Sequence, residues 1–155
     1  MIWQEAIAVR SQSDLISNFN KFLLLHRDIN EITIWMDNCA AQNKNWSLYC
    51  FFIGFINSEH NKINCIKLKY LETGHTFMSA DSFHHQVDKS LKQKGKVLDF
   101  DNYKNCVQSS NSGRTNCIEM TINDFLDVKD HSSRLKLRKT TPRPYLSNFC
   151  KAHFI

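Results

Sequence analysis

Residues 32–45 read ITIWMDNCAAQNKN, so a short apolar run, residues 32–36, leads directly into Asp37. The run is rich in β-branched and aromatic residues and is bounded by polar ones, which predicts a strand. Open α/β sheets bind their ligands just beyond the carboxyl ends of strands. The acid at this strand end, with amides and small residues behind it, therefore indicates a binding site or the remnant of one.

The length and the charge of the chain set limits on what it is. At 155 residues it amounts to one domain. Its net charge of +5, with a sequence pI near 8.9, is compatible with nucleic-acid binding but does not require it. We expect a core over residues 1–130 and a basic tail over residues 131–155 that contains Pro142 and Pro144. That tail contacts phosphates or is simply solvated.

The cysteines and the apolar stretches indicate a soluble protein of a reducing compartment. Six cysteines are scattered without any C-x-x-C pair, and several lie in apolar runs, where cysteine behaves as a small hydrophobe. We therefore expect reduced thiols and no cysteine-based zinc site. The longest apolar stretch, residues 46–56, is far shorter than the about 20 residues that span a bilayer. No signal peptide opens the chain, so we expect no membrane partner.

Helices and strands are expected to alternate along the chain. The pattern predicts a helix capped by Ser13, a strand over 32–36, a helix over 43–57 with a strand as its alternative, a strand over 63–71 and a helix over 79–94. This order favours an α/β fold with parallel strands. Further elements are a helix over 98–110, a short strand over 118–122, and residues 1–9 as an extended segment or a helix start.

A second polar cluster, GHTFMSADSFHHQVD at residues 74–88, follows the second strand as Asp37 follows the first. If the strands are parallel neighbours, both clusters emerge at one sheet edge, where Asp37 and Asp81 face each other. Two such carboxylates suit a pair of Mg²⁺ or Mn²⁺ ions. A pair of these ions about 4 Å apart stabilises both oxygens of phosphodiester cleavage.

The second cluster also has plainer interpretations. Asp81 is equally a first-turn acid that complements the helix dipole, and Asp88 lies about 10 Å further along the axis, toward solvent. His75, in the preceding loop, shuttles a proton or is solvated. His84 and His85 pair at helical spacing with the two acids, which suits either a transition metal or an exposed helix face.

A thiol nucleophile is a further candidate, since Cys39 lies beside Asp37 and His75 is available as a base. No device that stabilises an oxyanion is evident in the sequence.

The two clusters resemble a known family. D-N-C-A-A-Q-N-K-N-W at residues 37–46 and G-H-T-F-M-S-A-D-S-F-H-H-Q-V at residues 74–87 resemble the D-N-C-x-G-Q-N-x-N and G-H-[ST]-x-x-x-x-D blocks of transposase-derived proteins in animal genomes. Those blocks lie on a ribonuclease-H-like (DDE transposase/integrase) core. W-Q-E-A-I-A-V-R-S at residues 3–11 resembles the segment before the first core helix, so the resemblance covers roughly residues 3–95.

This resemblance implies a three-layer α/β/α fold with Asp37 as the second catalytic acid and Asp81 as the third. It also implies Mg²⁺ or Mn²⁺ as cofactor, DNA as partner, His75 as an assisting group and a nuclear, intracellular location. The expected nucleic-acid contacts are Asn38, Gln42, Asn43, Lys44, Arg138 and Lys139.

Two departures from the family pattern set the functional hypotheses. Ala41 stands where the pattern has glycine, and the first acid belongs on a strand before Trp3. We therefore expect a partial core that lacks its first strands, which a homo-oligomer or an upstream segment would complete. Glu5 is the candidate substitute ligand, and the sequence does not decide whether Glu5 or Asp88 serves as an additional acid. The leading hypothesis is a truncated or domesticated transposase core. The alternatives are an inactive nucleic-acid-binding or protein-interaction module and an unstable gene fragment.

Overall fold

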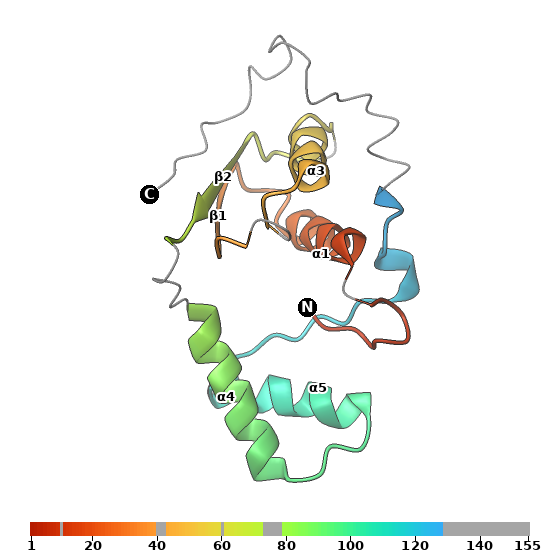
Figure 1. Cartoon of the computed structure of the whole chain (residues 1–155), viewed down its shortest axis with the longest axis vertical. Helices are drawn as coiled ribbons and strands as arrows, with labels where there is room; N and C mark the ends of the chain where they lie inside the picture. The colour runs from red at the N-terminus through yellow and green to blue at the C-terminus, as the bar shows by residue number, and fades with distance from the viewer. Residues whose placement is uncertain (10, 40–42, 60, 73–78, 129–155) are drawn as a thin grey trace. The chain divides into compact units, whose positions relative to one another are not determined.

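The structure is a computed structural model that describes residues 1–9, 11–39, 43–59, 61–72 and 79–128 (Figure 1). Within these residues it contains four α-helices and one two-stranded sheet, so the predicted α/β class is confirmed. The chain divides into two compact units. We call residues 10–76 with 124–155 the sheet unit, and residues 1–9 with 77–123 the helical unit. The predicted tail over residues 131–155 lies outside the described residues.

The sheet unit is built around strands β1 (Glu31–Met36) and β2 (Cys65–Tyr70), which pair in parallel from Glu31↔Cys65 to Met36↔Tyr70. A parallel pair needs a long crossover connection, and helix α3 (Trp46–Ile56) lies within it. Both predicted strands and their parallel direction are therefore confirmed. The segment 43–57, for which a strand was the alternative, contains a helix.

The inner face of the sheet packs against α3 and against helix α1 (Gln12–Leu25), as Figure 1 shows. Alternate residues of each strand point to this face, because side chains alternate along a strand. These strand residues and the buried side chains of the helices form one apolar core of this unit, together with Ile63 and Val128: Ile16, Leu23, Ile32, Met36, Leu48, Phe51, Phe52, Phe55, Ile63, Ile66, Leu68, Tyr70 and Val128. The Phe52 ring is the largest side chain in the core that is fully buried, and it packs edge-on against Phe19 at 5.3 Å.

The prediction that Ser13 caps α1 is wrong, because Ser11 is the cap. The Asp14 backbone N–H donates to Ser11 Oγ at 3.3 Å, and the Ser11 backbone N–H donates to the Asp14 carboxylate at 2.7 Å. This reciprocal pair needs an acid or amide three residues after the cap, and only Ser11 has one there. The helical stripe is present, with Ile16 and Leu23 buried, but Phe22 is 40% exposed.

The helical unit contains helices α4 (Ser79–Lys94) and α5 (Phe100–Ser109), together with the short turn η1 (Asn111–Gly113). Helix α4 has the predicted bounds, and Asp88 on it is exposed as predicted. Helix α5 begins later than predicted because the Asp99 carboxylate accepts from the Asn102 N–H at 2.7 Å and so caps it.

The predicted strand over residues 118–122 is wrong. A single parallel bridge between Ile2 and Glu119 forms there, so residues 1–9 are extended at this point. Met120 is buried, as an alternating strand requires, but Ile122 is 67% exposed and begins the turn η2 (Ile122–Asp124). The alternating sequence at residues 118–122 therefore reflects the burial of Met120 alone. The segment at Ile2 supplies the backbone hydrogen bonds there.

The capping pattern of α1 makes a direct prediction. The substitution Ser11→Ala removes the side-chain acceptor and should lower the free energy of unfolding by about 1 kcal/mol. Its matched control, Ser13→Ala, keeps the cap and should cost clearly less. Urea unfolding followed by circular dichroism measures both, and equal losses in the two variants would contradict the assignment of the cap.

Candidate functional site

Asp37 lies directly after β1, at the carboxyl end of the strand, and its side chain is exposed. Its Oδ1 accepts the Cys39 backbone N–H at 3.2 Å and a second hydrogen bond from the Asn43 side-chain amide. The first of these bonds closes a local turn in which an aspartate side chain accepts the backbone N–H two residues later, a conformation that aspartate favours. Both donors meet the same oxygen, so the carboxylate is oriented while Oδ2 has no assigned donor among the described residues.

The loop that carries Asp37 is fastened to the end of β2. The Asn43 N–H donates to the Cys39 carbonyl at 2.8 Å, which closes the loop on itself. The hydroxyl of Tyr70, the last residue of β2, donates to the Asn43 carbonyl at 2.8 Å. Because that uses the only hydroxyl proton of Tyr70, the 3.1 Å contact with Tyr49 has Tyr49 as the donor. The two strand ends and α3 are thereby linked at one edge.

The chemistry of Tyr70 suits this fastening role. Burial raises the pKa of Tyr70 well above its ordinary value, so the phenol keeps its proton and its donor function even at alkaline pH. The Lys44 ammonium lies 4.8 Å from the centre of the Tyr70 ring, a cation–π contact that holds a positive charge at the loop.

Helix α3 begins immediately after this loop. Asn45 caps it, since its side-chain oxygen accepts the Leu48 N–H at 2.8 Å. The Gln12 side chain donates to the same oxygen from α1. Strand, loop and helix thus follow one another in this part of the chain, with Asn43 in contact with the acid and Lys44 in contact with the Tyr70 ring.

The second predicted acid belongs to the other unit. Asp81 is exposed in the first turn of α4, in the helical unit, so its approach to Asp37 stays a prediction. Glu5 is exposed in the same unit as Asp81. Several predicted residues lie outside the described part of the chain: Ala41, Gln42, His75, Arg138 and Lys139.

The described residues contain no cluster of three or more His, Cys, Asp or Glu side chains that could hold a metal ion. Asp37 supplies one exposed oxygen ligand of the hard type that Mg²⁺ and Mn²⁺ prefer. None of the five described cysteines forms a disulfide, and burial raises the pKa of Cys50, which keeps that thiol protonated. The pairing of Cys39 with His75 involves a residue outside the described ranges and stays a prediction.

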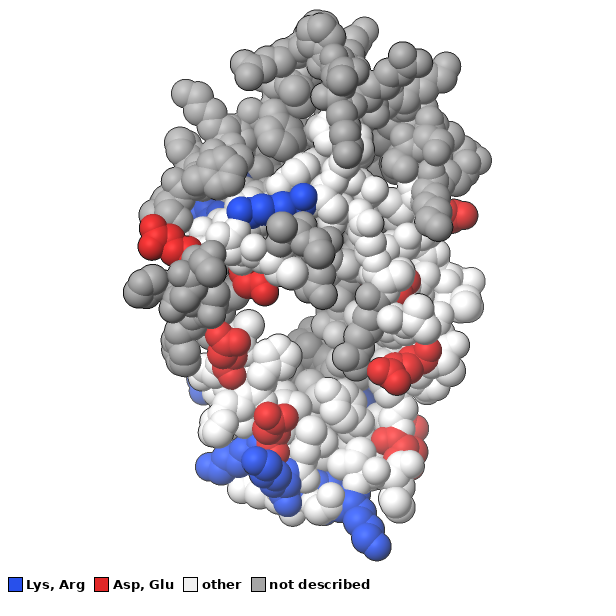
Figure 2. Space-filling view, in the orientation of Figure 1, with Lys and Arg blue, Asp and Glu red and all other residues white. Residues whose placement is uncertain are grey.

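Helix α4 carries a basic patch that the sequence analysis missed. Figure 2 shows Lys and Arg side chains gathered at the lower end of the view, over the C-terminal half of α4. We define the α4 patch as the exposed lysines of this region: Lys89, Lys92, Lys94 and Lys96. The signal in the sequence was four lysines within eight residues. The acid Asp88 directly precedes the first of them.

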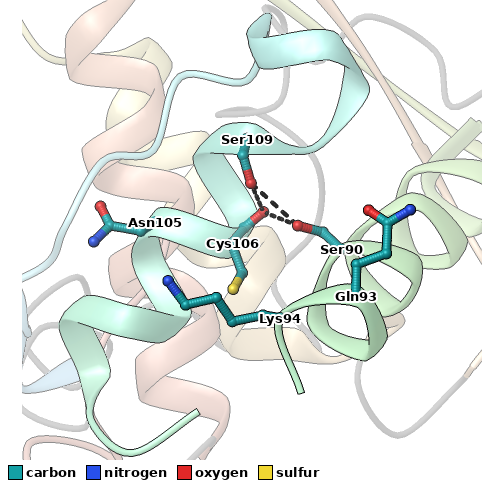
Figure 3. Close-up of a pocket in the computed structure, with 6 residues that line it drawn as sticks. All are labelled: Ser90, Gln93, Lys94, Asn105, Cys106 and Ser109. Atoms are coloured by element: carbon teal, nitrogen blue, oxygen red, sulfur yellow. Dashed lines mark hydrogen bonds between the residues drawn. The ribbon is translucent and has the colours of Figure 1, made fainter. Parts of the chain in front are cut away.

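A polar pocket of about 390 Å³ lies between α4 and α5 (Figure 3). The hydroxyls of Ser90 and Ser109 donate to the Cys106 carbonyl at 2.9 and 3.0 Å. The Ser90 proton therefore joins α4 to α5, while the Ser109 proton is used within α5. Lys94 extends from α4 toward α5 in the same view, and Gln93 and Asn105 complete the lining. The pocket therefore lies where α4 packs against α5, and polar side chains line it.

These features define an α/β domain with an exposed aspartate, Asp37, in the loop at a strand end and with exposed lysines at the C-terminal half of α4. Residues 13–144 match the family described as Domain of unknown function (DUF7869), and the chain belongs to this family. None of the curated proteins and none of the solved structures matches the chain. No helix in the described part is both long enough and apolar enough to cross a bilayer.

The fastening of the Asp37 loop makes a prediction. Tyr70→Phe removes the hydrogen bonds to the Asn43 carbonyl and from Tyr49, and should lower the free energy of unfolding by about 1–2 kcal/mol. Tyr49→Phe, the matched control, removes one hydrogen bond and leaves Tyr70 on Asn43, so it should cost about 1 kcal/mol or less. Urea unfolding measures both changes. A larger loss in Tyr49→Phe than in Tyr70→Phe would contradict the assigned contacts of Tyr70.

Proposed function

We propose that this chain forms part of a ribonuclease-H-like, DDE transposase/integrase-type core, truncated or domesticated, that acts on DNA. In this proposal Asp37 and Asp81 bind Mg²⁺ or Mn²⁺ and serve two-metal phosphodiester cleavage and strand transfer. The observation that carries it is the Asp37 carboxylate, which two donors orient at the carboxyl end of a parallel strand. Its neighbours in the sequence resemble the block around the second acid of transposase-derived proteins, with Ala41 in place of glycine.

The neighbours of Asp37 support a ligand role for this acid. Both donors engage Oδ1, so Oδ2 is available to a metal ion while the carboxylate stays fixed. Asn43 acts as the positioning residue, and Tyr70 holds Asn43 in turn. Bound metal ions would stabilise the attacking and leaving oxygens of the phosphodiester. His75 would move a proton at the leaving oxygen, and the first acid would come from an upstream segment or from a partner subunit that completes the sheet.

The α4 patch supports a second candidate function, DNA binding without cleavage. Its lysines are exposed, and lysines gain affinity for DNA by releasing the counterions of its phosphates. Binding of this kind needs no metal and weakens steeply as salt rises. The two functions are separable by mutation, because the lysines of the patch are different residues from the two proposed metal ligands, Asp37 and Asp81.

The metal-binding proposal predicts a charge-dependent Mn²⁺ site. Asp37→Asn keeps the size and hydrogen bonding of the side chain but removes its charge. It should weaken Mn²⁺ binding about tenfold or more, a change of about 1.4 kcal/mol, as should Asp81→Asn. Asp88→Asn, an exposed acid on the same helix as Asp81, is the matched control and should bind as wild type. Isothermal titration calorimetry measures the affinities, and plasmid cleavage in Mn²⁺ measures activity.

Two results would contradict the metal-binding proposal. One is an equal Mn²⁺ affinity in wild type and Asp37→Asn. The other is plasmid cleavage that Asp37→Asn leaves unchanged, because a ligand to a catalytic metal cannot be neutral to the reaction.

The DNA-binding candidate predicts a change in salt dependence. In the variant Lys89→Gln/Lys92→Gln, each lost phosphate contact should reduce the slope of log affinity against log salt by about 0.9 on duplex DNA. Lys62→Gln changes an exposed lysine of the sheet unit and serves as the control. Fluorescence anisotropy with a labelled duplex gives the slopes, and an unchanged slope in the double variant would exclude the α4 patch as a DNA contact.

A further inference from the structure

The outer face of the β1–β2 sheet carries side chains of a different kind from the inner face. Glu31, Thr33 and Trp35 of β1 alternate with the core residues and are exposed. Lys67 and Lys69 occupy the corresponding positions of β2 and are partly exposed. The Trp35 side chain is 47% exposed, although tryptophan is largely buried on average.

Register places an aromatic ring and a cation together on this face. Trp35 pairs with Lys69 across the sheet, and the Lys69 ammonium lies 4.7 Å from the centre of the indole ring. Lys67, two residues before Lys69, forms a diagonal ion pair at 2.6 Å with Glu31, four residues before Trp35. That pair is locally neutral, so the face presents one excess positive charge, at the exposed ring.

We propose that Trp35 and Lys69 form a stacking platform for a single-stranded nucleic acid. The proposal rests on the nucleic-acid partner of the proposed function and adds a site to it. The indole ring would stack against a base, which every base permits because each has a π-face. The Lys69 ammonium would move from the ring to the adjacent phosphate, which exchanges an exposed cation–π contact for a charge pair.

The position of Trp35 along β1 links this platform to the acid. Trp35 precedes Asp37 by two residues, a separation of about 7 Å along an extended strand. Asp37 itself lies in the loop just beyond the end of β1. A strand of nucleic acid with a base on Trp35 would therefore lie next to the loop that carries Asp37.

The composition of the outer face favours nucleic acid over a protein helix as its occupant. A docked amphipathic helix needs a continuous apolar groove of several side chains. The described outer face has one large exposed apolar side chain, Trp35, surrounded by Thr33 and charged residues. A single aromatic platform beside a cation matches the stacking and phosphate contacts of single-strand binding.

The test is a titration of the full chain with fluorescein-labelled oligo(dT) of 20 nucleotides at low salt and without divalent metal. Binding should quench tryptophan fluorescence, and Trp46→Phe, which changes another exposed tryptophan of the same unit, should keep that quenching. Trp35→Phe should abolish most of the quenching but retain most of the affinity. Trp35→Ala should bind about tenfold more weakly, and Lys69→Met should reduce the salt dependence.

Three results would overturn the platform: no binding by wild type, equal affinity in Trp35→Ala, or quenching that is lost in Trp46→Phe instead of Trp35→Phe. Thermal melting of each variant by circular dichroism shows whether that variant is folded. If Trp35→Ala does not fold, the fluorescence of Trp35→Phe provides the test. The titration contains no metal, so a failure here leaves the Mn²⁺ affinities of the Asp37 variants standing. Equal Mn²⁺ affinities would overturn the metal site alone.

Discussion

The parallel pairing of β1 with β2 is the constraint on which the rest of the sheet unit depends. It requires a crossover, which contains α3, and it puts the carboxyl ends of both strands at one edge. That edge is where the Asp37 loop and the Tyr70 hydroxyl meet through the Asn43 carbonyl. The same register brings Lys69 over the Trp35 ring on the outer face. Both proposed sites therefore follow from one pairing.

The sequence predicted these elements because their signals are strong and local. The run before Asp37 alternates a buried with an exposed residue, as does the lysine-bearing strand, and both alternations survive as burial in the structure. Helix α4 matches its predicted range, and its end is marked by Gly95, whose φ of 79° favours glycine. Strong periodicity between clear breaks is sufficient to predict an element.

The remaining features depend on contacts between distant residues. The cap of α1 required a choice between two nearby serines, and the acid at Asp14 decides it. Met120 is buried beside Ile2, a partner 118 positions away in sequence, so its alternation resembled a strand. The role of Tyr70 in holding the Asp37 loop follows from the register of two strands, which a linear pattern does not contain.

The central claim is that Asp37 and Asp81 hold metal ions together. The most direct measurement is a crystal structure of the chain soaked in Mn²⁺, with anomalous scattering recorded to locate the metal. The account predicts an anomalous peak about 2 Å from carboxylate oxygens of both acids. A fully ordered structure in which no Mn²⁺ lies at Asp37, or in which Asp81 binds its own ion far from Asp37, would contradict it.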